Sequence, residues 1–333
     1  MDHRLQQLTK WLEKQLKNQI ELIPIVGDAS FRRYFRIKDN DQYIVMDSPP
    51  ELEDFHPYIH ITRAFRKLGL NTPEVFLAEE KQGFLLISNF GTKLYHYELN
   101  ASNVDHYYQL ALDDLIIIQS CQGIENWPLP VFGWEAMHKE LNFFTEWFLD
   151  KYLHLAITPD LLQLLNDTYN ILLTSAVNQP QVCVHRDYHS RNLMMLPDNK
   201  VGILDFQDAV IGPITYDLVS LIRDCYIDWP VAQVECWALI FYKMLQSSSQ
   251  LKSISKEEYL RWFDLMGLQR HLKAIFIFAR KELRDNNDFY LQFISRALNY
   301  VKQISAKYPE LNVFNEFLLT KIFPAWEKKK VFA

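Results

Sequence analysis

The chain has 333 residues, which is enough for about two folding units with a large hydrophobic core. Its 35 Lys and Arg residues against 41 Asp and Glu residues give a net charge of −6, which argues against a nucleic-acid partner. Only 9 residues are glycine, and none are spaced for a G-x-G-x-x-G dinucleotide fingerprint or a Walker A loop, so both motifs are excluded.

The N-terminal residues, the length of the apolar runs and the cysteines predict the cellular compartment of the protein. The first residues lack the apolar core of a signal peptide, and the apolar runs are far shorter than the ~20 residues that span a bilayer. The 4 cysteines form no C-x-x-C pair, and three have apolar neighbours, as buried thiols in a reducing compartment do. We therefore expect a cytoplasmic protein with no membrane partner.

The first quarter of the chain mixes helix and strand patterns. Apolar residues at helical spacing predict an amphipathic helix over residues 5–16, and a second helix is predicted over 55–68, closed by Gly69. Short β-rich runs predict four strands, at residues 34–37, 43–46, 75–78 and 84–87. The order strand, strand, helix, strand, strand is typical of a small antiparallel sheet with one helix packed on it.

Beyond residue 91 the apolar periodicity is mostly helical. It predicts helices over residues 102–120, 134–152, 158–176, 215–225, 229–246, 267–285, 289–307 and 311–321. Strand-like runs interrupt them at residues 182–184, 193–195 and 201–204. We expect an α+β fold with a small antiparallel-sheet N-lobe over residues 1–90 and a mainly helical C-lobe over residues 91–333.

One segment concentrates polar side chains between two apolar runs. It contains the pattern H-x-D-x-x-x-x-N from His185 to Asn192, and a second apolar run ends at Asp205. Phosphoryl transfer needs a carboxylate that orients the attacking hydroxyl, and an amide and a second carboxylate that hold Mg²⁺ against the phosphates. The pattern is expected by chance only about 0.04 times in such a chain, so it indicates a phosphotransferase.

Two other interpretations of this segment remain open. His185, Asp187 and His189 alternate along the chain and could share one face of a strand as metal ligands. No motif such as H-x-x-E-H that could complete a metal site stands nearby. The segment could also be a polar loop whose side chains only cap the backbone.

The frame resembles the aminoglycoside-phosphotransferase-like branch of the protein-kinase fold. Within that branch it is most similar to the bacterial anomeric kinases that act on N-acetylmuramate and N-acetylglucosamine in peptidoglycan recycling. The similarity spans about residues 20 to 290. Its blocks are GDASFRRYFR at 27–36, IVMDSPP at 44–50, FLLISNFG at 84–91, HRDYHSRNLM at 185–194 and the long stretch at 205–226. The resemblance implies a two-lobed, protein-kinase-like fold.

The resemblance implies a role for each polar residue of the pattern. Asp187 is expected to be the catalytic base that aligns the sugar hydroxyl. Asn192 and Asp205 are expected to act with it in catalysis by coordinating Mg²⁺. His185 and Asp217 are expected to hold the catalytic loop by hydrogen bonding, Asp217 from the start of a helix.

An ATP site in the N-lobe is also implied by the resemblance. Gly27 and Ser30 are expected in a turn over the phosphates, where backbone N–H groups and a hydroxyl can donate to anionic oxygens. Ser88 and Phe90 are expected in the interlobe hinge at residues 88–91, which offers backbone groups to adenine.

The strand that carries the phosphate-binding lysine of protein kinases departs from their pattern. Met46 stands where that lysine is expected, and the helix over residues 55–68 has no glutamate to pair with it. Arginines surround the phosphate turn instead, and we predict Arg33 as the phosphate contact, with Arg36 as the alternative. The arginines could also form an exposed strand edge. The missing lysine could indicate a pseudokinase, but all three catalytic residues are present.

The acceptor pocket is expected beside Asp187, with hydrogen-bonding groups on a partly apolar floor. Its candidate residues are Tyr188, His189, Arg191, Arg223 and Asp224. Either arginine could pair with the lactyl carboxylate that distinguishes N-acetylmuramate from N-acetylglucosamine. Alternatively, Arg191 orients the catalytic loop, and Arg223 and Asp224 form a local ion pair at a helix end.

The predicted helix over residues 267–285 carries a group of basic side chains, Arg270, His271, Lys273 and Arg280. The group could supply another anion contact, but we expect it to form a solvated basic face. The catalytic loop also has cationic neighbours, whereas a pocket for a polycationic aminoglycoside is expected to be lined with carboxylates. This difference favours a neutral or anionic sugar.

The sequence therefore predicts an ATP- and Mg²⁺-dependent kinase of the anomeric hydroxyl of N-acetylmuramate or N-acetylglucosamine. The anomeric position rests on the resemblance alone. The expected partners are the amino sugar and the nucleotide. Two alternatives remain: an aminoglycoside antibiotic phosphotransferase and a catalytically inactive, nucleotide-binding pseudokinase.

Overall fold

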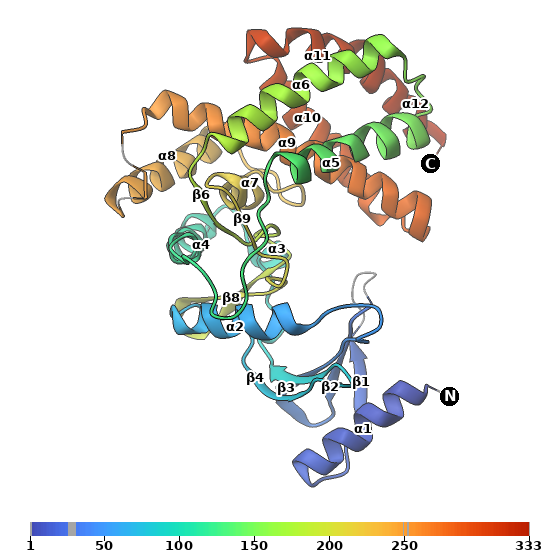
Figure 1. Ribbon diagram of the computed structural model, residues 1–333, viewed down its shortest axis with the longest axis vertical. Coiled ribbons are helices and arrows are strands. Elements are labelled where there is room, and N and C mark those ends of the chain that lie inside the picture. The colour runs from blue at the N-terminus through green and yellow to red at the C-terminus, as the bar shows by residue number, and fades with distance from the viewer. Residues whose placement is uncertain (1, 26–30, 249, 252, 333) are drawn as a thin grey trace. The chain divides into compact units, whose positions relative to one another are not determined.

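Figure 1 shows the computed structural model of the chain, which describes residues 2–25, 31–248, 250–251 and 253–332. The chain forms two compact units, each assembled from separate stretches. The first comprises Met1–Asp114, Gly123–Pro128 and Arg191–Asp208, and the second comprises Leu115–Gln122, Leu129–Ser190 and Ala209–Ala333. The lobe boundary at residue 90 stays a prediction. Among the described residues, no helix has both the length and the apolar character that a membrane crossing requires.

A five-stranded antiparallel sheet lies in the first unit, with the strand order β1-β2-β3-β5-β4. The strands are β1 (Leu22–Ile25), β2 (Arg33–Ile37), β3 (Asn40–Asp47), β4 (Val75–Glu79) and β5 (Phe84–Ser88). The four predicted strands are confirmed. The sequence pattern missed β1 because Pro24 interrupts its short apolar run, and proline is tolerated there since β1 is an edge strand.

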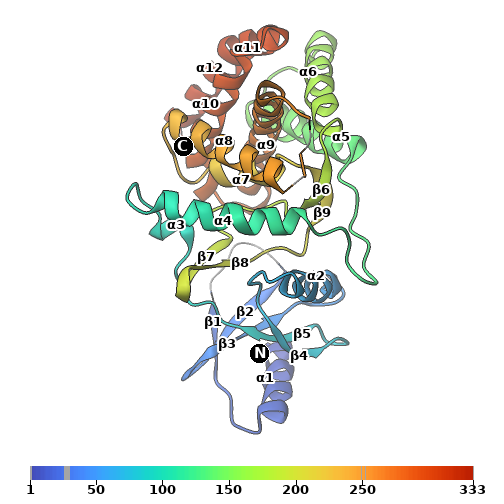
Figure 2. The same cartoon turned by 90° about the vertical axis from the view of Figure 1, so that its left-hand side faces the viewer.

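Helices α1 (His3–Leu16) and α2 (His56–Lys67) cover opposite faces of this sheet (Figure 2). Side chains alternate between the faces of a strand, so alternate residues of β2, β3 and β5 face α1. The resulting core contains Leu8, Trp11, Leu12, Phe35, Ile37, Val45, Phe84 and Leu86. Both helices were predicted within one or two residues of their observed ends.

A buried carboxylate at the end of β3 joins α1 to the sheet. Asp47 is fully buried. Its Oδ1 accepts hydrogen bonds from Arg4 Nε at 2.9 Å and Nη2 at 2.5 Å, and its Oδ2 accepts from Arg33 Nε at 3.0 Å and Nη2 at 2.5 Å. Two bidentate guanidinium groups therefore compensate one carboxylate, which a buried charge requires.

The first unit also contains the hairpin of β7 (Leu193–Leu196) and β8 (Lys200–Ile203). Both strands were predicted from their apolar runs. Short bridges join the hairpin to Asn71 and Leu94. Helix α3 (Tyr95–Glu98), which was not predicted, and the predicted helix α4 (Val104–Gln119) follow the sheet.

The second unit is built around α9 (Lys256–Asp285), which packs against several other helices. These are α5 (Trp134–Phe143) with its π-helical continuation Phe144–Tyr152, α6 (Pro159–Val177), α7 (Tyr216–Ile222), α8 (Val231–Ser247) and α10 (Ile294–Ser305). The C-terminal segment forms α11 (Asn312–Phe317), a π-helical turn at Leu318–Ile322 and α12 (Phe323–Phe332), so the predicted helical end at residue 321 is too early. A short sheet pairs β6 (Gln181–Val184) with β9 (Val210–Pro213).

Helix α9 begins at Lys256 and not at Gly267, where the sequence pattern predicted its start. Ser255 caps it by accepting a hydrogen bond from the N–H of Glu258 at 3.1 Å. A glycine inside a helix costs about 1 kcal/mol relative to alanine, which is why Gly267 was interpreted as a boundary. A Cβ at this position would lie 2.8 Å from Nη1 of Arg223, so the glycine makes room for a guanidinium.

Candidate active site

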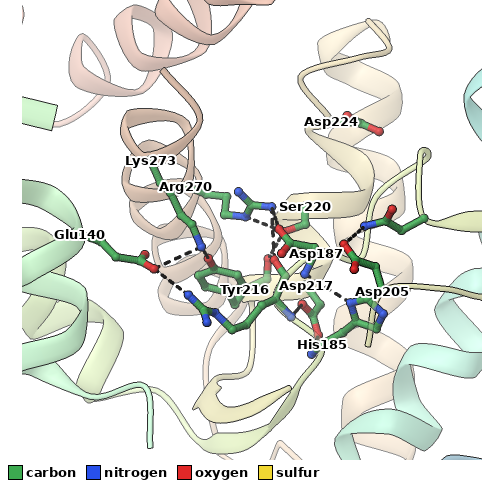
Figure 3. Close-up of polar contacts among 12 residues, drawn as sticks. Glu140, His185, Asp187, Asp205, Tyr216, Asp217, Ser220, Asp224, Arg270 and Lys273 are labelled. Atoms are coloured by element: carbon green, nitrogen blue, oxygen red, sulfur yellow. Dashed lines mark hydrogen bonds and ion pairs between the residues drawn. The ribbon is translucent and has the colours of Figure 1, made fainter. Parts of the chain in front are cut away.

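The segment that follows β6 is fixed by hydrogen bonds from its own backbone. Asp217, in the first turn of α7, accepts from the N–H groups of His185 at 2.6 Å and Arg186 at 3.0 Å (Figure 3). The N–H of Asp187 donates to Nδ1 of the fully buried His185 at 3.3 Å. Arg186 has a φ of +77°, which turns the chain sharply before Asp187. The predicted supporting roles of His185 and Asp217 are confirmed.

Asp187 carries an ionised carboxylate. Its side chain is 35% exposed, and its Oδ1 lies 3.3 Å from Nη2 of Arg270. Burial raises the pKa of Asp187, but the positive charges of Lys273 and Arg270 lower it more, with smaller contributions from His189 and His185. The net result is a pKa well below the ordinary value of an aspartate. The carboxylate therefore accepts hydrogen bonds and does not donate them at neutral pH.

The basic side chains of α9 do not form a solvated face, as the sequence led us to expect. Arg270 is 11% exposed and donates from Nε to Ser220 Oγ at 2.8 Å. Lys273 is 9% exposed, donates to the Tyr216 hydroxyl at 3.1 Å and lies 3.3 Å from Oε1 of Glu140. The prediction was wrong because α9 is enclosed by other helices, and nearby carboxylates compensate its cations. The apolar run after Lys273 was the signal that these positions are buried.

A cavity of about 200 Å³ lies beside Asp187, entirely within the second unit. Four predicted site residues line it: Asp187, His189, Arg223 and Asp224. The remaining lining is Ser220, Cys225, Tyr226, Arg270, His271, Ala274, Ile277 and Phe278. Polar groups therefore stand on a partly apolar floor, as expected of a sugar pocket.

Two other acceptor candidates lie elsewhere. Tyr188 is fully buried and does not line the cavity, so it packs beneath the loop. Arg191 belongs to the first unit and is also absent from the lining of this cavity.

Arg223 and Asp224 are neighbours in sequence but have different partners. Arg223 is 8% exposed and donates from Nη2 to Oδ1 of Asp264 on α9 at 2.6 Å. Asp224 accepts from the N–H groups of Ser190 at 2.9 Å and Tyr226 at 2.8 Å. The helix-end ion pair between Arg223 and Asp224 is thus replaced by a long-range pair with Asp264. Asp224 orders the loop that bears Asp187 and His189.

The predicted metal ligands meet in the first unit. Nδ2 of Asn192 lies 3.3 Å from Oδ2 of Asp205, and the Gln207 side-chain amide donates to Oδ1 of Asp205 at 2.8 Å. Asp205 is exposed and has a φ of +59°, a conformation that Asp and Asn adopt more readily than most residues. An exposed carboxylate beside an amide is the oxygen donor set that Mg²⁺ accepts, with phosphate oxygens and water completing its shell.

The predicted nucleotide contacts are only partly described. Gly27 and Ser30 lie outside the described residues. Ser88 ends β5 and its Oγ accepts from the N–H of Glu74 at 2.9 Å. The Phe90 ring packs over Gly202, where a Cβ would lie 2.7 Å from it. These assignments stay predictions.

Arg33, the predicted phosphate contact, has other partners. Its guanidinium pairs with the buried Asp47 and with Asp2, on the face of the sheet that carries α1. The assignment of Arg33 to phosphate binding also stays a prediction. Its partners in the structure are the carboxylates of Asp2 and Asp47.

Comparison with known proteins gives a consistent result. Residues 21–238 match the family described as "Phosphotransferase enzyme family". The N-acetylmuramate/N-acetylglucosamine kinase of Pseudomonas aeruginosa is 37% identical over 331 residues, which cover 95% of this chain and 96% of that protein. The kinase of the same name from Neisseria meningitidis serogroup B is 36% identical, covering 91% of this chain and 92% of that protein.

Solved structures resemble the chain in fold. The ADP-bound aminoglycoside phosphotransferase APH(2'')-Ib has a TM-score of 0.59 and 16% identity, and the match covers 91% of this chain and 99% of that one. The choline kinase LicA from Streptococcus pneumoniae has a TM-score of 0.61 and 14% identity, covering 91% of this chain and 100% of that one. Together with the antiparallel sheet and the helical second unit, these matches confirm the protein-kinase-like fold expected from the sequence.

Proposed function

The chain belongs to the phosphotransferase enzyme family, and we propose that it transfers the terminal phosphoryl group of ATP to the anomeric hydroxyl of N-acetylmuramate or N-acetylglucosamine. The observation that carries this proposal is the position of Asp187, beside Arg270, at the wall of a cavity with polar groups and an apolar floor. The choice of sugar is supported by relatives of that name, which are similar over nearly the whole chain. Because the reaction consumes ATP, we assign it to the cytoplasm. Its substrates there would be sugars released in peptidoglycan recycling.

Asp187 would orient the attacking hydroxyl by accepting its hydrogen bond. A strongly basic carboxylate is not needed, because in a loose transition state the hydroxyl keeps its proton until late in the transfer. The low pKa of Asp187 keeps this carboxylate negatively charged at neutral pH. The proton then passes from the hydroxyl to this carboxylate as the new P–O bond forms.

The acceptor would be held by the other groups of the cavity. His189 and Asp224 offer hydrogen-bonding partners for sugar hydroxyls, and Phe278 offers an apolar surface for a ring. Arg223 would pair with the lactyl carboxylate of N-acetylmuramate, since a guanidinium has five N–H donors and its pairing with Asp264 uses only some of them. Arg191 stays a prediction for the sugar.

Asn192 and Asp205 would hold Mg²⁺ on the nucleotide phosphates, with Gln207 orienting the carboxylate of Asp205. The ion would neutralise the charge that develops on the transferring phosphoryl group. Gly27, Ser30, Ser88 and Phe90 stay candidates for the nucleotide itself.

Two observations separate this function from the alternatives. An aminoglycoside would place its own positive charges against Arg223 and Arg270 in the cavity, which disfavours an antibiotic as the acceptor. A pseudokinase has no chemical need for an ionised Asp187 and for an Asn192–Asp205 pair together.

The test is an ADP-release assay with purified protein and four acceptors: N-acetylmuramate, N-acetylglucosamine, glucose and kanamycin. We expect Mg²⁺-dependent turnover with one or both of the N-acetylated sugars, and a product that carries phosphate at the anomeric carbon in ³¹P NMR spectra. Turnover with kanamycin alone would identify an antibiotic kinase. ATP binding without ADP release on any acceptor would identify a pseudokinase.

The acid limb of the pH profile is expected to depend on Arg270. Replacing Arg270 with methionine removes a positive charge that favours the ionised carboxylate, so the pKa of Asp187 rises toward its ordinary value. The acid limb of kcat/KM then moves to higher pH. Profiles recorded from about pH 3 to 7, which include the ordinary pKa range of an aspartate, measure the shift. The conservative variant Arg270→Lys retains the charge and should keep the wild-type limb, and an unshifted limb in Arg270→Met would contradict the assignment.

A further inference from the structure

The strand position that carries the phosphate-binding lysine in protein kinases holds a buried, uncharged side chain in this chain. Met46 is fully buried in β3, opposite Tyr34 of β2 and Leu85 of β5. Its thioether has no positive charge for a phosphate. A substitute cation must therefore reach the same face of the sheet from another position.

The register of the sheet helps to separate Arg33, the first residue of β2, from Arg32, which directly precedes the strand. Arg33 opposes Asp47 and stands on the α1 face, where it pairs with that buried carboxylate. Tyr34 opposes Met46 and stands on the other face. Arg32 directly precedes β2 and its charge acts on the hydroxyl of Tyr34, which places it on the face of Tyr34 and Met46.

Arg32 forms a half-buried ion pair on that face. Its Nη2 lies 2.5 Å from Oε1 of Glu53, and the two side chains are 6% and 27% exposed. Glu53 lies in the segment that leads into α2 and stands three positions before His56, the first residue of that helix. The pair therefore resembles the arrangement of a kinase, in which a lysine of the sheet is held by a glutamate of the adjacent helix, but here Arg32 stands just before β2 and Glu53 just before α2.

The ion pair and the predicted metal site act on common neighbouring side chains. Tyr58 of α2 packs against Phe206, the residue after Asp205, with ring centroids 4.8 Å apart. Burial raises the pKa of Tyr34 to about 12, and the charges of Arg32 and Asp205 act on the same hydroxyl with opposite signs. Both charges also act on the buried hydroxyl of Tyr58. Arg32 and Asp205 are thus within electrostatic reach of common groups inside the first unit.

We propose that Arg32, positioned by Glu53, binds the α- and β-phosphates of the nucleotide and so replaces the lysine that β3 lacks; this proposal rests on the function proposed above. A guanidinium presents five N–H donors in a plane, so it can keep a carboxylate partner and still donate to phosphate oxygens. Arg33 then has a separate structural role, which is to fasten β2 to α1 through Asp47.

Nucleotide binding without any sugar tests this assignment. Calorimetry should compare Mg·ADP with adenosine, which lacks phosphates, for the wild type, Arg32→Met and Arg32→Lys. We expect Arg32→Met to weaken Mg·ADP binding by roughly 10- to 100-fold, as expected for the loss of charge-assisted hydrogen bonds, and to leave adenosine binding unchanged. Arg32→Lys should lose less. Arg63→Met, which removes an exposed arginine of α2, is the matched control and should bind both ligands like the wild type.

A half-buried glutamate left without its cation can destabilise the fold, so the double variant Arg32→Met/Glu53→Gln is measured as well. It removes both charges and should fold while still losing Mg·ADP affinity. An equal loss for adenosine and Mg·ADP, or an unchanged Mg·ADP affinity in the folded double variant, would overturn the role of Arg32. A wild-type chain that shows this phosphate-dependent difference but phosphorylates no sugar would overturn the proposed acceptor and not this inference.

Discussion

Replacing Asp187 with alanine is expected to lower kcat by about 10³-fold, within the range that a positioned proton acceptor contributes. The attacking hydroxyl loses the carboxylate that orients it. Asp224 is the other carboxylate among the residues that line this cavity. Asp224 is engaged by two backbone N–H groups and cannot take over without loosening the loop. The nucleotide contacts proposed in the first unit are unchanged, so the Kd for Mg·ATP should stay within about threefold of the wild type. Steady-state ADP release and calorimetry measure the two quantities.

The control for this variant addresses the cation that loses its partner. Removing the carboxylate leaves Arg270 without the Asp187 contact, so Asp187→Asn, which keeps an oxygen acceptor of the same shape, is measured in parallel. Both variants should lose turnover, and Asp187→Asn should keep more of the wild-type thermal stability than Asp187→Ala, because its oxygen still accepts from Arg270. Asp160→Ala, an exposed aspartate in the first turn of α6, should leave kcat unchanged. Near-normal turnover in Asp187→Asn would remove Asp187 from the reaction.

The strands and helices that were predicted correctly are those in which the apolar pattern and the turn residues agree with the tertiary packing. The runs that became β2, β3, β4 and β5 alternate or are uniformly apolar, and their turns are marked by polar or glycine residues. The pattern failed where tertiary packing overrides propensity. Pro24 lies in an edge strand, and the glycine inside α9 is tolerated because Arg223, the residue after α7, occupies the space of its missing side chain.

The candidate site was predictable to the extent that its residues lie close together in sequence. His185, Asp187 and Asn192 have a spacing that the chemistry requires, and the loop bonds from Asp217 followed from its place at a helix start. Burial of Arg270 was not predictable, because a basic residue on a helix signals solvent unless its compensating carboxylates are known. Those carboxylates come from segments about 80 and 130 residues away in the chain.

The choice between neighbouring arginines was also beyond the sequence. A strand register shifted by one residue would exchange the faces of Arg32 and Arg33, and no local signal fixes that register. It is set by the pairing of Tyr34 with Met46 and by the insertion of Asp47 between Arg33 and Arg4 of α1. The sequence therefore indicated several candidate arginines, and only the structure shows that Arg32 pairs with Glu53 and Arg33 with Asp47.

Replacing Asp205 with asparagine is expected to lower kcat/KM for Mg·ATP by about 10³-fold, because the metal site loses its only full negative charge among the described side chains that meet there. Asparagine is preferred to alanine because it tolerates the φ of +59° at this position. The matched control is Asp198→Asn in the turn of the β7–β8 hairpin, which precedes Asp205 in the chain; this aspartate is exposed and has the same φ of +59°. Titrations of activity with Mg²⁺ should give a greatly raised half-saturating concentration for Asp205→Asn and a wild-type value for Asp198→Asn. If Asp205→Asn saturated with Mg²⁺ at the wild-type concentration, the cation would have to be held elsewhere, and the assignment of Asn192 as its second ligand would fall with it.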